Sequence, residues 1–359
     1  MTTTTQRPHS DGHSVKHMPK SKLRVWIIGI LCLIMLCFVM LASIMFGSAA
    51  MTVSEIWGTL SHKLGFMISP DFPAPSQLRQ SILLELRIPR ILMAAAVGAA
   101  LAVAGVALQS VTHNDLAEPY LLGVSAGAST GAVTVLLFLS SSAIGLSGGA
   151  VVGALCSFGL LLFLLRGSGF ASTRVVLTGV LVGQLFSAFT SLLLVARGDA
   201  ENVRGVMFWL LGTLGSSRWD SFVIVAIVSI IAIVVLWSMA RYFDALSFGD
   251  DTANSMGVPV NIVRAIALIT VALLTAATVS AVGAIGFVGL IVSHAARLLV
   301  GPNHARLIPI AAIIGSNLLV ITDAAARSVF SPQEIPVGVF TALIGVPIFF
   351  FLLKRGRRL

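Results

Sequence analysis

Apolar runs of membrane-crossing length recur along the whole chain, separated by short polar segments. A helix needs about 20 mostly apolar residues to cross the roughly 30 Å hydrocarbon core of a bilayer. The runs are continuously apolar and rich in Ala, Gly, Leu and Val, whereas the strands of a membrane barrel alternate over about 10 residues. The pattern therefore predicts an all-α, polytopic membrane helical bundle of about ten transmembrane helices. The expected spans are 25–46, 91–110, 120–139, 143–165, 175–195, 222–240, 262–281, 285–299, 307–321 and 337–353.

The composition excludes an ordinary soluble domain. Hydrophobic residues make up 57% of the 359 residues, charged residues only 10%, and the mean hydropathy is +0.99. An average soluble domain carries about 25% charged residues. The net charge of +9 is spread over loops and tails instead of forming one aromatic-studded face. It therefore indicates membrane orientation and not a nucleic-acid partner.

The basic residues predict which side of the membrane each loop faces. With the N-terminus in the cytoplasm, roughly 15 of the 23 Lys and Arg residues lie in inside loops and tails, in agreement with the positive-inside rule. Both termini are then cytoplasmic. The loops expected inside are 113–119, 166–174, 241–261 and 301–306, and those expected outside are 47–89, 196–221 and 322–336.

The chain divides into a short tail and one membrane domain. Residues 1–24 are polar and rich in His, Thr and Lys, which predicts a disordered cytoplasmic N-terminal tail. The run 25–46 is longer than the roughly 7 to 15 apolar residues of a cleaved signal peptide, so we expect it to remain as the first span. Residues 25–359 then form one transmembrane domain, with a cytoplasmic loop at 242–261.

Glycines recur at the spacing at which membrane helices approach one another. Such small residues let helix backbones come close where the hydrophobic effect gives no drive to associate. One segment, Gly123-Val124-Ser125-Ala126-Gly127, also matches the G-x-S-x-G motif of a serine nucleophile. That motif needs a preceding strand and a later acid and His, so helix packing is favoured and an intramembrane enzyme using Ser125 is a minor alternative. The spaced glycines are Gly123, Gly127, Gly131, Gly145, Gly149, Gly153, Gly179 and Gly183.

The sequence shows neither an ion-coupling site nor an ATP-hydrolysis motif that could drive uphill transport. No Asp, Glu, Lys or Arg is expected near mid-membrane, whereas ion-coupled secondary carriers, the main alternative, usually place ionisable or unwound sites there. A P-loop needs Gly-Lys-Ser or Gly-Lys-Thr to hold phosphates, and none of the five lysines follows a glycine. An ATPase, if one is used, is a separate polypeptide.

Ordered sequence motifs cover most of residues 56–353. The first block begins at Leu86-Arg87-Ile88-Pro89-Arg90 and continues through the Gly- and Ala-rich segment 97–109. Further blocks are Asn114-Asp115-Leu116-Ala117-Glu118-Pro119, the segment 121–128, the segment 284–294 and the segment 336–347. One such block would be weak, but several in order are specific. Together they resemble the FecCD/BtuC-like permease family of ABC importers, which take up iron-siderophores, haem and cobalamin, and residues 25–359 would then be the transmembrane permease domain.

The resemblance implies a type II ABC importer permease in the bacterial cytoplasmic membrane. It implies ten helices per subunit, with helices two to five and seven to ten as inverted relatives. The partners would be a second permease subunit, identical or a close paralogue, two cytoplasmic ATPases that bind ATP and Mg, an external solute-binding protein and membrane lipid. This chain itself would hold no cofactor and no metal, and would not be an enzyme.

The resemblance also assigns roles to residues at both membrane faces. Arg87, Arg90 and Arg327 match arginines that dock the binding protein, although they could simply snorkel at the membrane boundary. Inside, a short helix with Ser247 as its cap and with Gly257 and Pro259 as its stop matches the helix that couples to the ATPase. Its coupling residues are Asp250, Asp251, Thr252, Ala253, Asn254, Ser255, Met256 and Gly257.

The family's inner gate maps onto two predicted cytoplasmic loops. The matching residues are Asn114, Leu116, Ser172 and Thr173, which could equally be turn and helix-cap residues. Three positions depart from the usual pattern: His113 stands for a common Arg, Asp115 for a common Pro, and Ser293 for a common Pro. Loop stiffness and the bend near His294 are therefore expected to differ. Haem ligation by His294 or His304 is a minor alternative to hydrogen-bonded groups at the membrane boundary.

Overall fold

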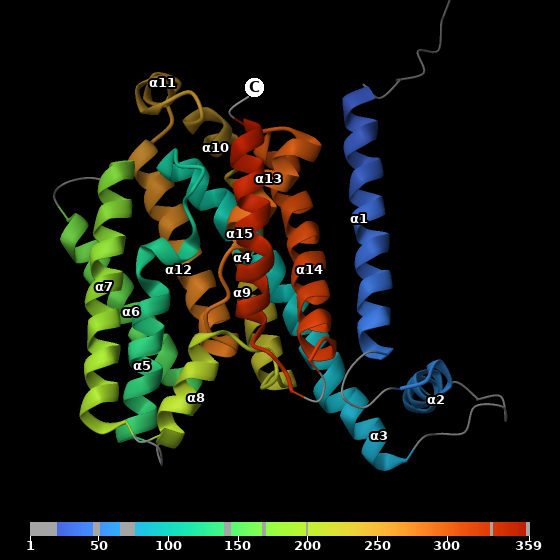
Figure 1. Cartoon of the computed structure of the whole chain (residues 1–359). Helices are drawn as coiled ribbons and strands as arrows, with labels where there is room; N and C mark the ends of the chain where they lie inside the picture. Colours follow the sequence, from blue (N-terminus) through green and yellow to red (C-terminus); the bar gives the residue numbers. More distant parts are fainter. Residues whose placement is uncertain are drawn as a thin grey trace, which may run out of the picture.

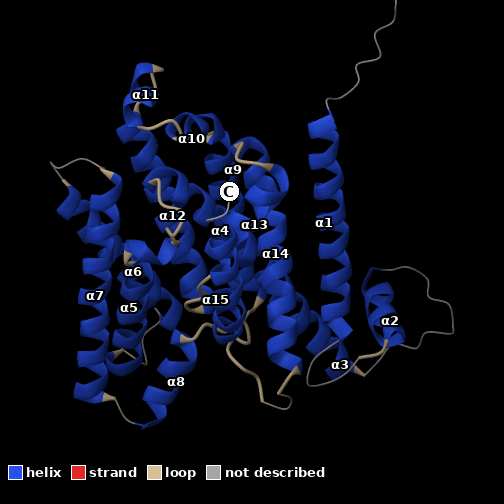
Figure 2. Cartoon of the chain, turned by 45° about the horizontal axis from the view of Figure 1, so that its top comes forward, coloured by secondary structure: helices blue, strands red, loops and turns tan. Residues whose placement is uncertain are grey.

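The computed structural model describes residues 20–45, 51–64, 76–139, 145–166, 170–198, 200–330 and 333–356. Within these residues it is helical and contains no strand (Figure 2). Seven helices are long and apolar enough to cross a membrane, and three shorter apolar helices accompany them. The all-α bundle is thus confirmed. The ten are α1 (Lys20–Met45), α4 (Ile88–Thr112), α5 (Val124–Phe138), α6 (Gly145–Leu165), α7 (Ser172–Arg197), α9 (Trp219–Ser238), α12 (Val260–Val282), α13 (Val288–Val300), α14 (His304–Ser328) and α15 (Val337–Gly356).

The first helix begins earlier than the sequence predicted. It starts at Lys20 instead of residue 25, so the last residues of the expected tail are helical. The remainder of that tail, residues 1–19, lies outside the described residues. The starts of α1 and the end of α15 lie on the same side of the bundle as α11 (Asp250–Ser255), as Figure 1 shows. The first and last described residues therefore lie on one side of the bundle, and a cytoplasmic position of both termini stays a prediction.

Helix α4 forms the centre of the bundle. Nearly all of its residues between Val97 and Leu108 are buried, and it packs against α14, α13, α12 and α9. Helix α1 is the opposite case, because it contacts the bundle mainly along α14 and most of its side chains are exposed. Figure 1 shows it standing at the edge of the bundle. In a membrane such a helix is surrounded largely by lipid.

Several short helices lie in segments that were expected to be loops. At the end of the bundle opposite α11 these are α2 (Val53–Leu64), α3 (Gln77–Ser81) with the π-helical turn Ile82–Arg87, and α8 (Ala200–Leu210). On the other side, α10 (Ala240–Leu246) precedes α11. The π turn runs without a break into α4, so the helix of the second span begins several residues before the predicted start at residue 91. Apolar runs predict membrane spans well but give no signal for amphipathic connecting helices.

Two of the spans are too short to cross the membrane alone. At 1.5 Å per residue, the 15-residue α5 and the 13-residue α13 are about 20 Å long. Each is preceded by a segment without regular α-helix, residues 113–123 and 283–287. The two segments contact each other, so both enter the interior of the bundle from opposite sides. They hold corresponding positions in the two sets of four helices that the resemblance relates by inversion.

Most of the spaced glycines lie where helix backbones touch. A Cβ added at Gly131 would lie 2.0 Å from the carbonyl oxygen of Gly149, and one at Gly153 would lie 2.1 Å from that of Gly127. These contacts join α5 to α6, and the packing prediction is confirmed there. Gly145 is an exception, because nothing lies within 4 Å of its added Cβ and its φ is +61°. It starts α6 and does not pack.

The central helix α4 also packs closely against its neighbours through glycines. An added Cβ at Gly98 would lie 2.2 Å from the carbonyl oxygen of Gly315 in α14, and one at Gly105 would lie 2.6 Å from the Cα of Gly289 in α13. Gly98, Gly105 and Gly289 all fall within the sequence blocks that carry the family resemblance. The small residues of these blocks therefore allow α4 to pack closely at the centre of the bundle.

The substitution Gly153→Ala is expected to destabilise the folded chain by about 1–3 kcal/mol, because its Cβ would collide with backbone atoms of α5. Gly159→Ala, in the same helix, is the matched control, since nothing lies within 4 Å of its added Cβ. Alanine also favours helix over glycine by nearly 1 kcal/mol. Apparent melting temperature in detergent measures both. Equal melting temperatures for the two variants would show that this glycine contact does not stabilise the bundle.

Candidate functional site

The short helix α11 projects from one end of the bundle (Figure 1). It covers Asp250–Ser255, and Gly257, with a φ of +81°, lies in the turn that follows. The helix therefore stops where predicted by Gly257 and Pro259, but it is two residues shorter than the predicted set. The proposed cap is wrong: the N-cap is Gly249, and the Ser247 hydroxyl donates to the Phe243 carbonyl instead.

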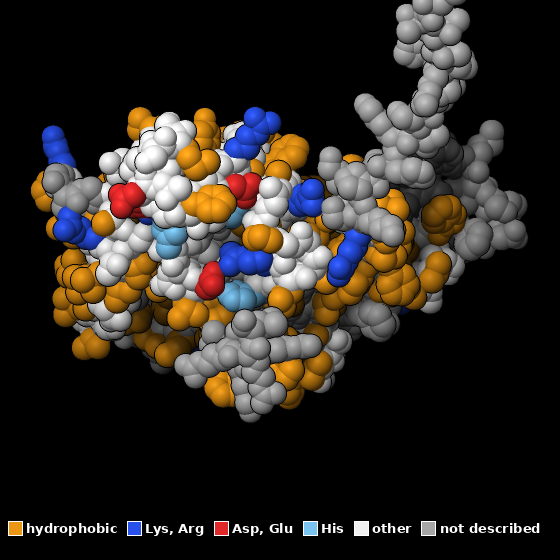
Figure 3. Space-filling view, turned by 90° about the horizontal axis from the view of Figure 1, so that it is seen from above, with side chains coloured by type: hydrophobic (Ala, Val, Ile, Leu, Met, Phe, Trp, Pro, Cys, Tyr) orange, Lys and Arg blue, Asp and Glu red, His pale blue; other side chains and the backbone are white. Residues whose placement is uncertain are grey.

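Most of α11 faces solvent. Asp251, Thr252, Asn254 and Ser255 are exposed, whereas Ala253 is fully buried and fixes the helix to the bundle. Two large apolar side chains lie exposed beside it, Phe248 at 69% and Met256 at 61%. Viewed from this end, the charged and His side chains gather on the face and hydrophobic side chains lie around its edge (Figure 3). This end is thus a polar surface with a few exposed apolar groups.

Arg264 of α12 joins α11 to the rest of this end. Its guanidinium donates two hydrogen bonds to the carboxylate of Asp250, at 2.7 and 2.8 Å. Its Nε donates to the carbonyl oxygen of Val111, at the end of α4, at 3.0 Å. Its Nη2 donates to the hydroxyl of Ser172, at the start of α7, at 3.1 Å and lies 3.3 Å from Nδ1 of His113. One side chain that is 3% exposed therefore connects four separate segments.

His113 strengthens this connection. It ends α4 in the left-handed region, with a φ of +49°, which is uncommon for a residue with a side chain. Its Nε2 lies 2.6 Å from the carbonyl oxygen of Leu246, at the end of α10. The residue that replaces the family's common Arg thus contacts both Arg264 and the segment leading to α11.

Two of the four predicted gate residues lie at or next to a contact of Arg264. Ser172 contacts Arg264 directly, and Asn114 follows His113 in the chain. The Asn114 side-chain oxygen accepts a hydrogen bond from the Leu116 N–H at 2.9 Å, which is the turn role that was weighed for it. Leu116 and Thr173 are exposed. The structure thus brings the two predicted loops together, and a gating role for these four residues stays a prediction.

Two other contacts fasten the same end. His304, at the start of α14, places Nδ1 2.7 Å from the Asp244 carboxylate and Nε2 2.6 Å from the Ser110 hydroxyl. Both of its ring nitrogens are therefore hydrogen-bonded.

The Asp115 carboxylate accepts a hydrogen bond from Arg297 at 2.7 Å, so the residue that replaces a common Pro connects its loop to α13. Helix α13 itself runs without a break through Ser293.

The two non-helical segments meet in the bundle interior. The Tyr120 hydroxyl donates to the Ile285 carbonyl at 2.7 Å and accepts from the Ile285 N–H at 2.6 Å. The Glu118 carboxylate accepts a hydrogen bond from the N–H of Phe287, whose φ is +67°. The expectation that no acidic residue lies deep in the membrane is therefore wrong for Glu118. Its loop folds back into the bundle, which hydropathy along the sequence cannot show.

Of the three arginines predicted to dock a binding protein, Arg87 and Arg327 are buried and Arg90 is partly buried. Arg90 donates to the Asp323 carboxylate at 2.9 Å and to Glu334 at 2.8 Å. The Arg327 Nε lies 3.0 Å from the other Asp323 oxygen, and the side chain of Arg87 donates to the Ile44 carbonyl. Their charges are thus balanced mainly within the chain, which the sequence did not indicate. Docking by these residues stays a prediction.

Sequence reasoning missed the central residue of the inner site. No role for Arg264 follows from the sequence motifs, and Asp250 is predicted as one residue of the coupling helix without a partner. A signal was present, because an Arg inside an apolar run is costly unless it is paired.

The predicted nucleophile motif gains no support: α5 follows the 3-10 turn Pro119–Leu122 and not a strand, and Gly127 packs against Gly153.

Comparisons with known proteins agree with this architecture. The chain matches the FecCD transport family over residues 33–355. It is 41% identical to the cobalamin import system permease protein BtuC of Halobacterium salinarum, over 77% of this chain and 74% of that protein. It is 32% identical to the Fe(3+)-citrate import system permease protein YfmD of Bacillus subtilis, over 97% and 99%.

A solved structure shares the fold along almost the whole chain. An inward-facing metal-chelate type ABC transporter superposes with a TM-score of 0.80 at 29% sequence identity, covering 92% of this chain and 99% of the other. The family match spans far more than half of the residues, and the Bacillus subtilis relative is aligned almost end to end. The chain is therefore a member of the FecCD transport family, whose relatives here are membrane permeases of ABC importers.

Proposed function

We propose that this chain is the permease subunit through which a binding-protein-dependent ABC importer moves an iron-siderophore, haem or cobalamin across the bacterial cytoplasmic membrane. The observation that carries the mechanism is the Arg264 network, which links an exposed helix to the two inner loops. Family membership selects this function over an ion-coupled carrier or an intramembrane enzyme. Relatives named for cobalamin and Fe(3+)-citrate support the class of solute.

In the proposed mechanism, α11 lies on the cytoplasmic side and receives the ATPase. ATP and Mg bind to two partner ATPases and not to this chain. A ligand shifts a conformational equilibrium only through its differential affinity for the two states. ATP-bound ATPase must therefore prefer one position of α11. Asp250 would pass that preference to Arg264, and Arg264 to the segments that begin or end at Val111 and Ser172.

The outer arrangement suggests how the binding protein would engage. A second permease subunit, identical or paralogous, would complete the pathway, and the external protein would dock over both. Glu334 is 41% exposed, whereas the Arg90 side chain beside it is 12% exposed. A carboxylate of the binding protein could replace Glu334 as the partner of Arg90. Such charge pairing mainly sets register and encounter rate.

The overall function is tested in proteoliposomes. The purified chain with its ATPase and binding protein is expected to accumulate iron chelate or cobalamin only when ATP is supplied on the α11 side. The chain alone, in the same vesicles with an ion gradient, is the control and should accumulate none. Concentrative uptake by the chain alone would contradict the proposal.

The substitutions Phe248→Asp and Met256→Asp are expected to weaken ATPase association at least about tenfold, because exposed apolar anchors contribute strongly to interfaces. Met256→Leu is the matched control, since it keeps an apolar side chain of similar size. Co-purification of ATPase with the tagged permease measures the effect. If both Asp variants retained full ATPase, another surface of the chain would have to be the contact.

A further inference from the structure

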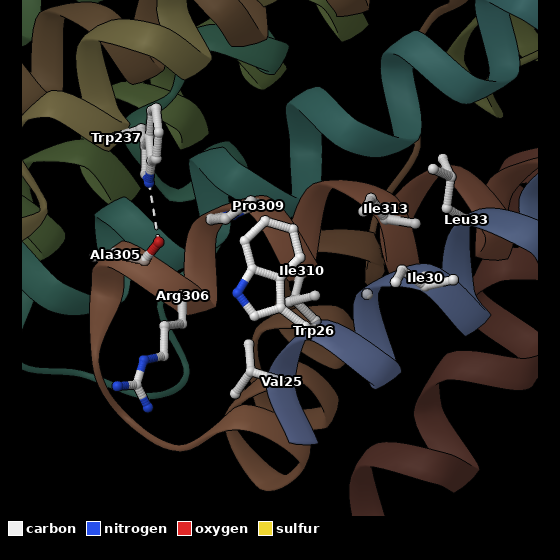
Figure 4. Close-up of a pocket in the computed structure, with 11 residues that line it drawn as sticks. Val25, Trp26, Ile30, Leu33, Trp237, Ala305, Arg306, Pro309, Ile310 and Ile313 are labelled. Atoms are coloured by element: carbon white, nitrogen blue, oxygen red, sulfur yellow. Dashed lines mark hydrogen bonds between the residues drawn. The ribbon is translucent and has the colours of Figure 1, made fainter. Parts of the chain in front are cut away.

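A cavity of about 470 Å³ lies between α1 and α14, against the end of α9 (Figure 4). Ile30 and Leu33 of α1 face Ile310 and Ile313 of α14 across it, and Trp237 of α9 lies at one side. The two helices also pack closely at Gly29, where an added Cβ would lie 3.2 Å from the Ile310 side chain. The lining is thus almost wholly aliphatic and aromatic, and it opens at the edge of the bundle.

Such a cavity does not hold water. Apolar cavities remain dry and take up apolar molecules, and a void leaves its lining without contacts on one side. Helix α1 is a membrane-spanning helix that contacts the bundle mainly through α14. The apolar molecule available at that position is therefore the acyl chain of a membrane lipid.

The end of the cavity nearest α11 is basic. Arg306 lies at the Val25 end of the cavity, as Figure 4 shows, and Arg24 is exposed one residue before Val25. Among the described residues, no carboxylate forms an ion pair with Arg24 or Arg306. The Trp237 indole N–H donates to the Ala305 carbonyl at 3.0 Å, one residue before Arg306. Tryptophan marks the level of lipid headgroups.

We propose that this cavity binds one anionic phospholipid from the leaflet on the α11 side. One acyl chain would lie between Ile30 and Ile313, and the phosphate would lie beside Arg306 and Arg24. Basic pockets between transmembrane helices on this side are suited to anionic headgroups. The lipid would fill the gap that α1 leaves against α14 and hold the helix in place. The proposal does not depend on which solute the importer carries.

The test is native mass spectrometry of the full chain purified from membranes and exchanged into nanodiscs of phosphatidylglycerol or phosphatidylcholine. The wild-type chain is expected to retain one phosphatidylglycerol at a detergent concentration that removes phosphatidylcholine. Arg306→Gln should lower phosphatidylglycerol retention about tenfold. Arg166→Gln is the matched control, because Arg166 is exposed near the same end, directly after α6.

A second pair of variants tests the acyl-chain position. Ile313→Phe should fill the cavity and reduce retention of the lipid, and Ile30→Phe serves the same purpose if the first variant does not fold. Ile231→Phe, at an exposed position of α9, is the control. Equal retention of both lipids, an Arg306→Gln variant that binds like Arg166→Gln, or a second copy of the chain bound in place of lipid would each overturn the proposal.

Discussion

Replacing Arg264 with alanine is expected to lower ATP-driven solute uptake about 100-fold, which corresponds to about 2.7 kcal/mol. The buried guanidinium binds Asp250, Val111 and Ser172 together, and hydrogen bonds that involve a charged group contribute about 1.5–3 kcal/mol each. The link between α11 and the inner loops would be broken. The measurement is uptake per hydrolysed ATP in proteoliposomes containing the complete importer.

The controls separate transmission from simple folding. Arg166→Ala removes an exposed charge near the same face and should leave uptake unchanged. Arg264→Lys keeps the charge but lacks the planar fork, so intermediate uptake is expected. ATPase association should persist in Arg264→Ala, because Phe248 and Met256 remain. Loss of ATPase association together with uptake would instead mean that Arg264 only supports the fold of α11, and unchanged uptake would refute its role.

Replacing Tyr120 with phenylalanine is expected to destabilise the chain by about 3 kcal/mol or more and to reduce uptake in proportion. The hydroxyl binds both the N–H and the carbonyl of Ile285, and no water is present in a bilayer interior to replace it. Each buried backbone group left unsatisfied costs about 1–3 kcal/mol. Thermal denaturation in detergent, with uptake measured on the surviving protein, gives both quantities.

The only other tyrosine provides a matched control. Tyr242 is 44% exposed on α10, so Tyr242→Phe removes the same hydroxyl without burying an unsatisfied group. Glu118→Gln tests the neighbouring contact, because the amide oxygen can still accept from Phe287 N–H and should preserve stability better than Glu118→Ala. Similar melting temperatures for the Tyr120 and Tyr242 variants would show that the two segments are held together by other contacts.

The arginines Arg87, Arg90 and Arg327 show that a local sequence pattern predicts the position of a charge but not its partner. Their positions in the sequence correctly placed Arg87, Arg90 and Arg327 near one end of the bundle, at the start of α4 and the end of α14. Whether a guanidinium is free or paired depends on what lies beside it. Asp323 and Glu334 are more than 230 residues away from Arg90 in the chain, and no local pattern connects them.

The sequence alone determined that the chain is a helical membrane protein, where its seven long and three shorter apolar helices lie among the described residues, and to which family it belongs. Those properties follow from hydrophobicity and short motifs, which are local in the chain. Only the tertiary structure decided that Arg264 joins α11 to the inner loops and that Glu118 and Tyr120 enter the bundle. These contacts join segments 151 to 169 residues apart in the cases of His113 and Arg264, Tyr120 and Ile285, and Glu118 and Phe287. Their partners are set by how the helices pack, because a charge or hydroxyl buried in a membrane must find whatever polar group the packing brings near it.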